Sequence, residues 1–338
     1  MSATNTVSRR DALVLSSVAA AIVPAALWFA GALPWDAAHF GDNDAFVTVA
    51  DALRAGDFTD VPAQQFWGTS YLVAALGALT GIQSLHALWL CTWICAAATI
   101  WLAADLFGPV VAAWFGIANF PWLQRASLGG NEPIFLLLLL TTFHAARRGR
   151  WWLAALVAAL STTVRPVGAV ALASVVVALV AQRAARETVK AVVIAAVVAT
   201  AYALPLWRIY GDPLANIAWY REAAWHGQGL PVSFPLVPLV RGWILDPPMM
   251  ASAIKTVMWL GITLGGAAAL IRRGVARAMW TARPVETAFA FGGLLFVYCY
   301  NAPFWAPKEF ARFVLPVVPF ALIGLEPWGG FFVLKFVN

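Results

Sequence analysis

The sequence has little charge. Only 11% of its 338 residues are Asp, Glu, Lys or Arg, whereas 62% are hydrophobic. A soluble protein of this size could bury much apolar surface, but its exterior would need far more charge than this chain supplies. Repeated apolar runs near bilayer-spanning length indicate that lipid contacts that exterior. The composition therefore predicts an all-α, polytopic membrane helical bundle, with a single domain over residues 1–338 and no separate soluble domain.

Cysteine and histidine are also scarce, which excludes several kinds of site. Cys91, Cys95 and Cys299 fall in predicted spans and form no metal or disulfide pattern, so we expect them to be packing residues. The four histidines lack zinc-site spacing and stand as His39, His86, His144 and His226. No glycine-rich phosphate loop or nucleic-acid module is present. The net charge of +6 therefore does not indicate a nucleic-acid partner.

The basic residues occur in clusters that predict the topology. These clusters are at Arg9 and Arg10, Arg147 to Arg150, Arg183 to Lys190, and Arg272 to Arg283. By the positive-inside rule all four should be cytoplasmic, and about ten crossings satisfy this condition. The predicted spans are residues 11–33, 85–106, 109–126, 132–146, 151–164, 166–182, 188–207, 251–271, 285–301 and 313–334. We expect the first span to be retained, although Arg9 and Arg10 before an apolar run also resemble a cleavable secretion signal.

The ten-span topology requires that the apolar segment from Thr69 to Ile82 does not cross. With about 14 residues it is shorter than the roughly 20 that a perpendicular helix needs. We therefore expect an amphipathic or re-entrant helix at the outer face. The large outer loops would be residues 34–84, 208–250 and 302–312. The second loop is rich in proline and tryptophan, which predicts an interfacial aromatic belt or a surface on which one or two rings stack against sugar.

The first outer loop holds six of the 16 acidic residues, namely Asp36, Asp42, Asp44, Asp51, Asp57 and Asp60. Within it, Asp42, Phe46, Val49, Ala50 and Leu53 have the spacing of one helix face. Gly56 would end this helix. Asp42 and Asp44 would then lie near the outer mouth of the bundle. Alternatively, Asp42 has only a structural role, as the residue that caps the start of this helix.

Several segments resemble the GT-C superfamily of membrane glycosyltransferases, which use polyprenyl-phosphate sugars and include protein mannosyltransferases and arabinosyltransferases. The resemblance covers most of the chain in short motifs. They are Asp42 to Gly56, Gly68 to Leu72, Leu106 to Gly108, Asn131 to Phe135, Arg165 with Pro166, and Arg312 to Pro316. Two positions depart from the family pattern. Asn43 separates Asp42 from Asp44, where the family often has an adjacent acidic pair, and Phe46 replaces a tyrosine.

The resemblance implies sugar transfer, in which an acceptor hydroxyl loses a proton as it attacks the anomeric carbon. We expect Asp42 to be the catalytic base, with Asp44 or Asp36 as alternatives. Cations must face the departing phosphate, and the candidates on the outer face are Arg165, Lys308 and Arg312. Glu132 completes the predicted substrate-binding set. The implied partners are a polyprenyl-phosphate-sugar donor, a glycan, lipid or protein acceptor, and membrane lipids; a divalent metal is left open.

Structural roles compete with each of these assignments. Glu132 could pair with Arg165 or Arg125 to reduce the cost of charge near lipid. Arg312 and Lys308 could extend to the outer boundary or pair with Glu309. A transporter or flippase for a lipid-linked or amphipathic solute is the alternative function, because it would share an outer cavity and broken helices. Neither the sugar, the acceptor, the stereochemical outcome nor the oligomeric state follows from the sequence.

Overall fold

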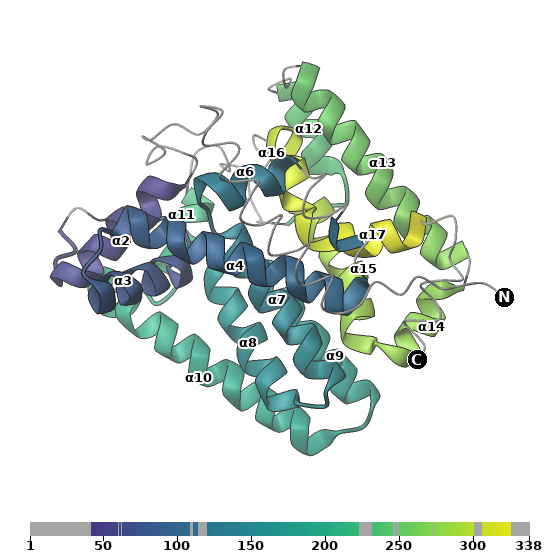
Figure 1. Ribbon diagram of the computed structural model, residues 1–338, viewed down its shortest axis with the longest axis horizontal. Helices are drawn as coiled ribbons and strands as arrows, with labels where there is room; N and C mark the ends of the chain where they lie inside the picture. Colours follow the sequence, from purple (N-terminus) through teal and green to yellow (C-terminus); the bar gives the residue numbers. More distant parts are fainter. Residues whose placement is uncertain are drawn as a thin grey trace.

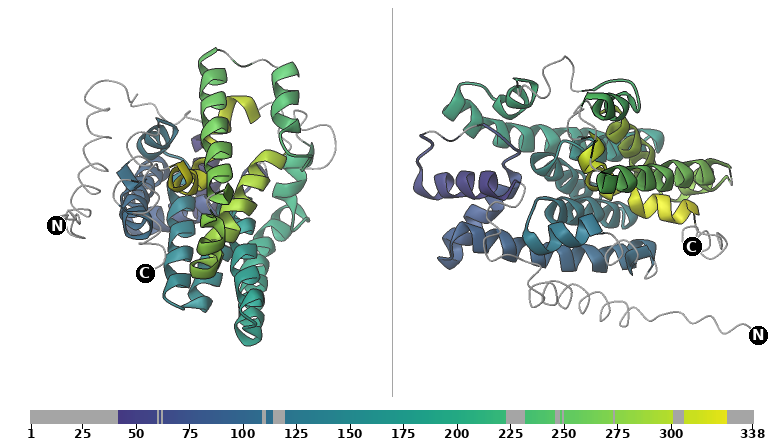
Figure 2. Two further views of the ribbon diagram at one scale, coloured as in Figure 1. Left: turned by 90° about the vertical axis from the view of Figure 1, so that its right-hand side faces the viewer. Right: turned by 90° about the horizontal axis from the view of Figure 1, so that it is seen from above.

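The computed structural model describes residues 42–59, 61, 63–108, 111–113, 120–222, 232–245, 248, 250–272, 274–300 and 306–325. Within these residues the fold is all-α, apart from one isolated antiparallel bridge between Val232 and Tyr300. The predicted span at 11–33 lies outside the described residues. So do parts of the predicted spans at 109–126 and 313–334. Helices α2 and α3 lie at one end of the long axis and α13 at the other (Figures 1 and 2).

The acidic loop forms the predicted helix. Helix α2 (Asn43–Ala55) buries Phe46, Val49 and Ala50 and ends at Gly56, whose φ of 71° is the left-handed conformation that glycine adopts most easily. Helix α3 (Gly68–Thr80) packs against α2. With 13 residues, α3 is too short to cross a bilayer perpendicularly, as predicted for this segment.

The centre of the molecule consists of helices that pack against one another. Helix α7 packs on α4 and α8, α8 packs on α9 and α10, and α9 packs on α15 (Figure 1). The bounds are α4 (Ser84–Phe107), α6 (Phe120–Leu128), α7 (Glu132–Arg147), α8 (Trp151–Val164), α9 (Gly168–Ala181), α10 (Ala185–Tyr210) and α15 (Pro284–Cys299). Apart from α6, which begins eleven residues after the start of the predicted span at 109–126, these helices start and end near the predicted span boundaries because apolar runs alternate with the basic turns.

Most of the remaining helices lie toward one end of this centre, whereas α11 packs on α10 near α2 (Figure 1). Helix α13 packs along α17 and α16, and Gly266 allows the close approach, because a Cβ there would lie 2.5 Å from the carbonyl oxygen of Ala321. The bounds are α11 (Ala215–Glu222), α12 (Val237–Leu245), α13 (Met250–Arg272), α14 (Val275–Ala282), α16 (Ala306–Phe313), the 3-10 helix η2 (Leu315–Val317) and α17 (Val318–Leu325).

Within the described residues, three helices are long and apolar enough to cross a membrane: α4, α10 and α13. A fourth candidate is the pair α6 and α7, which are bent by 112° at the break between Leu128 and Glu132. The structure thus supports a membrane protein with three or four spans of full length. Helices α8, α9 and α15 occupy predicted spans but have only 14, 14 and 16 residues.

Within a mostly aliphatic core, aromatic side chains from four helices meet. Phe107, Phe143, Phe289 and Phe320 are buried, and Phe143 meets Phe289 at 5.5 Å and Phe320 at 5.9 Å between ring centroids. Such edge-to-face pairs stabilise a core by about 0.5–1.5 kcal/mol each beyond the area that they bury. Cys91 and Cys95 are buried free thiols, as the packing interpretation predicted.

A buried ion pair closes the end of this core at the C-terminus of α7. Arg147 Nε lies 2.6 Å from Glu286 Oε1, and Arg147 Nη1 donates to the carbonyl oxygen of Leu106 at 2.9 Å. One arginine therefore joins α7, α4 and α15. The guanidinium also lies 5.9 Å from the centre of the Phe107 ring.

Candidate functional site

Four of the predicted site residues reach one place from four segments. Asp42 precedes α2, Glu132 begins α7, Arg165 follows α8, and Arg312 lies in the last turn of α16. Local sequence explains two of these placements. The residue before a proline favours an extended backbone, and Arg165, before Pro166, has φ −147° and ψ 144°.

The second placement depends on two glycines between α6 and α7. Gly129 has φ 94° and Gly130 has φ 150°, and a Cβ at Gly130 would lie 2.7 Å from Glu132 Oε2. Only glycine fits there without strain. The break therefore lets Glu132 begin a new helix, with Pro133 in its first turn where a missing N–H costs nothing.

Glu132 is the centre of the charged network. Its side chain is 1% exposed, and its Oε1 accepts from Arg165 Nη1 at 2.7 Å and from Arg312 Nε. This confirms the predicted pairing with Arg165. Arg125 in α6, the other predicted partner, lies 3.7 Å from Glu309 Oε2. Charged pairs of this kind reduce the cost of placing each charge away from water.

Arg312 joins Glu132 to Asp42. Its Nη2 donates to Asp42 Oδ2 at 2.8 Å, so its partners are Glu132 and Asp42 and not the predicted Glu309. Burial lowers the pKa of the Arg312 guanidinium, but the carboxylates of Glu132 and Asp42 outweigh burial and raise the pKa above its ordinary value. Arg312 is therefore charged at every physiological pH.

Asp42 occupies the cap position of α2 but makes no side-chain cap hydrogen bond. Its Oδ1 accepts from Gln65 Nε2 at 3.0 Å, and its side chain is 29% exposed. Gln65 is one of few non-glycine residues in the described chain with positive φ, at 63°. Asn216 holds that strained loop, since its Nδ2 donates to the carbonyl oxygens of Ala63 and Gln65.

Asp42, Arg165 and Arg312 line a cavity of about 520 Å³, which is large enough for a small-molecule ligand, whereas Glu132 is not among the lining residues. One part of its wall is polar and includes Asp42, Gln65, Arg125, Asn131, Arg165, Tyr300, Glu309 and Arg312. Another part is apolar and includes Val164, Val167, Phe296, Val297 and Phe313. Trp219, from the loop predicted to hold sugar-stacking rings, also lines the cavity. The arrangement can hold an anionic group beside an apolar one, with the carboxylate of Asp42 at the same cavity.

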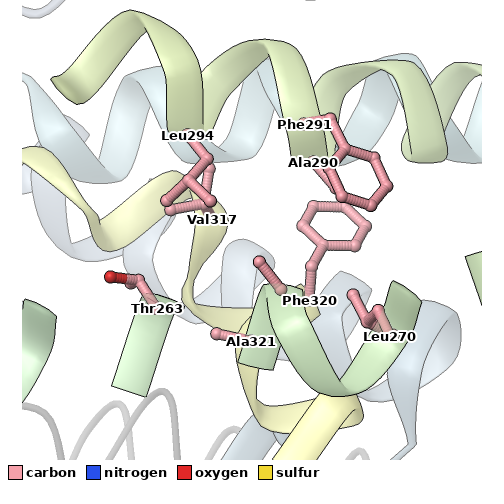
Figure 3. Close-up of a pocket in the computed structure, with 9 residues that line it drawn as sticks. Thr263, Leu270, Ala290, Phe291, Leu294, Val317, Phe320 and Ala321 are labelled. Atoms are coloured by element: carbon pink, nitrogen blue, oxygen red, sulfur yellow. The ribbon is translucent and has the colours of Figure 1, made fainter. Parts of the chain in front are cut away.

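A second cavity does not have this character. Figure 3 shows it between α13, α15 and α17, where Thr263 is the only hydroxyl among mostly apolar side chains. Its volume of about 20 Å³ has room for little more than one water molecule. The Thr263 hydroxyl is already paired with the Tyr298 hydroxyl at 2.7 Å. We regard this cavity as a packing feature.

For three predicted residues, the described structure shows no place at the cavity. Asp44 is exposed on the first turn of α2 and is not among the residues that line the cavity. Lys308 lies in α16, but its side chain is outside the described part, and Asp36 lies outside the described residues. No group of three or more His, Cys, Asp and Glu side chains in the described part is arranged to hold a metal ion.

Sequence reasoning missed Gln65 and Tyr300. Gln65 has no periodic or motif signal, although Gln64 and Gln65 are a polar pair in a mostly apolar chain. Tyr300 ends the predicted span at 285–301, where a tyrosine is expected for interfacial reasons alone. No family model, no curated protein and no solved structure matches the chain.

Proposed function

We propose that this protein is a glycosyltransferase that moves a sugar from a polyprenyl-phosphate-linked donor to a glycan, lipid or protein acceptor. The observation that carries the proposal is the meeting of Asp42, Arg165 and Arg312 at one cavity that also has an apolar wall. A donor of this class has the matching parts: an anionic phosphate, a polar sugar and an apolar chain.

In the proposed reaction, the acceptor oxygen attacks the anomeric carbon and the bond from that carbon to the phosphate oxygen breaks. The hydroxyl proton passes to Asp42, and the phosphate leaves with the bonding electrons. Arg165 and Arg312 would stabilise its developing negative charge through paired N–H groups. Glu132 would hold both guanidinium groups in place, since its Oε1 already contacts them.

The proposed location is a plasma membrane, with the cavity on the periplasmic or exterior face. The basic cluster after α7 is at the opposite end of that helix from Glu132, as the positive-inside rule requires for an outer cavity. In this proposal the shorter helices α8, α9 and α15 also cross, which gives about ten spans together with the segments outside the described residues.

Replacement of Asp42 tests the proposal. Asp42→Asn keeps the shape of the side chain but removes its ability to take a proton, so transfer should fall by roughly 10²-fold or more. The assay is release of polyprenyl phosphate by purified protein given hexosyl and pentosyl donors with an acceptor extract. Asp57→Asn is the matched control, because Asp57 is an exposed residue of the same loop. Full transfer by the Asp42 variant would reject Asp42 as the base.

A second candidate function is the transport or flipping of a lipid-linked or amphipathic solute. The 112° bend between α6 and α7 favours it, because broken helices often line the substrate sites of transporters. The same preparation separates the two functions after reconstitution in vesicles. Movement of the intact donor across the bilayer without cleavage of its phosphate bond would support transport.

A further inference from the structure

The charged side chains around the cavity are already paired with one another. Arg165 pairs with Glu132, Arg312 pairs with Glu132 and Asp42, and Arg125 pairs with Glu309. Three guanidinium groups thus face three carboxylates, and their formal charges cancel. An anionic ligand entering this site gains no net positive charge from these six groups unless one carboxylate gives up its cation.

The structure distinguishes which carboxylate can do so. Glu132 is almost fully buried between two arginines, so withdrawing it would leave an uncompensated buried charge. Glu309 Oε2 lies 3.7 Å from Arg125, beyond hydrogen-bond distance, so its withdrawal would change the pairing of Arg125 and not that of Arg312. Asp42 and Glu309 are both partly exposed, at 29% and 32%, but Asp42 is the one that contacts Arg312, at 2.8 Å.

Asp42 also has a second support. Gln65 donates to Oδ1, whereas Arg312 donates to Oδ2. If Arg312 turned to another anion, Gln65 would still hold the carboxylate at the cavity wall. The released Oδ2 would then be able to accept a hydrogen bond from a hydroxyl group in the cavity.

We propose that Asp42 competes with a phosphate-class anion for Arg312, so that binding of the anion releases Asp42 Oδ2 into the cavity. The order of binding follows from this competition: the phosphate-bearing ligand enters first and the hydroxyl-bearing ligand second. The role of Asp42 as a base rests on the proposed function, but the competition itself does not require turnover.

The test measures anion binding by thermal shift of the purified full chain in detergent, with inorganic phosphate and farnesyl monophosphate as separate probes. Asp42→Asn should bind both probes roughly fivefold or more tightly than the unaltered protein, the usual lower range for coupled sites. Preference for farnesyl monophosphate would assign the anion to a lipid headgroup, and equal binding would assign it to free phosphate. The competition predicts the gain in either case.

Two matched variants separate the competition from a general charge effect. Asp57→Asn removes one negative charge from the same loop and should leave probe affinity within about twofold, since exposed charges are screened by salt. Glu309→Gln should raise affinity less than Asp42→Asn. Equal affinities for the unaltered protein and Asp42→Asn, or a larger gain from Glu309→Gln, would overturn the proposal. If Asp42→Asn does not fold, Asp42→Ser gives the same comparison.

The outcome for the competition is separate from that for sugar transfer. A fivefold gain in anion binding without transfer from any donor would support the competition and reject the glycosyltransferase proposal. Measured transfer with no gain in anion binding would support the glycosyltransferase proposal and reject the competition.

Discussion

At the scale of single residues, Arg312 determines the geometry of the site. Its Nε and Nη2 contact two different carboxylates, one buried and one at the cavity wall. A planar guanidinium can do this because its N–H groups point in fixed directions. A lysine ammonium has the same charge but not that planar arrangement.

Arg312→Lys therefore separates phosphate recognition from simple attraction of charge. If Arg312 binds the donor phosphate, the variant should weaken donor binding or slow transfer by roughly 1–3 kcal/mol, the scale of a charged hydrogen bond. Donor titration of initial rates measures this loss. Arg165→Lys is the parallel case, because Arg165 also contacts Glu132 and lines the cavity. Unchanged donor kinetics in both variants would remove these residues from the phosphate site.

At the scale of elements, the break between α6 and α7 positions the buried charge. Asn43 supports it from α2, since its Nδ2 donates to the carbonyl oxygen of Leu128 at 2.8 Å. An aspartate at this position would place a carboxylate against that carbonyl. The asparagine that interrupts the expected acidic pair thus has a structural explanation: it links α2 to the end of α6.

Gly130→Ala should destabilise the protein by more than the backbone strain of an alanine at positive φ alone. Alanine at a positive φ costs roughly 1–2 kcal/mol, and overpacking against Glu132 Oε2 adds roughly 1–3 kcal/mol. Gly149→Ala is the control, because Gly149 has φ 67° and no heavy atom near the added Cβ. Thermal unfolding of both variants compares the costs. A loss of stability at Gly130 no larger than that at Gly149 would contradict the prediction.

The sequence predicted most helices and the turn between the spans at 109–126 and 132–146, but not the angle between α6 and α7. Alternation of apolar runs and basic turns places α8 at its observed bounds and α7, α13 and α15 within a few residues. Hydropathy carries no information on the 112° bend, which depends on glycine conformation and on contacts between distant segments. The same limit applies to the site. Charge and order along the chain allow the sequence to predict Asp42, Glu132, Arg165 and Arg312 as site residues. Gln65 gives no such signal, because it acts through a tertiary contact.

At the scale of the whole molecule, topology provides the most direct test. In a variant without native cysteines, Asp57→Cys should react with an impermeant maleimide added to intact cells, and Gln182→Cys should react only after permeabilisation. Both positions are exposed, so access to the solvent is matched. Labelling from outside at residue 182 and not at residue 57 would show that the orientation is opposite to the proposed one and that the cavity faces the cytoplasm.

Helix α7 has a buried ion pair at each end: Glu132 with Arg165 and Arg312, and Arg147 with Glu286. The two ends are roughly 22 Å apart at the usual rise per residue. An axial slide of even one residue would separate both pairs, at a cost of roughly 3–5 kcal/mol for each broken pair. The two ion pairs therefore hold helix α7 in place along its axis. Any motion that admits or releases a ligand must occur in the shorter segments around it, such as α11 and α16, whose side chains line the cavity.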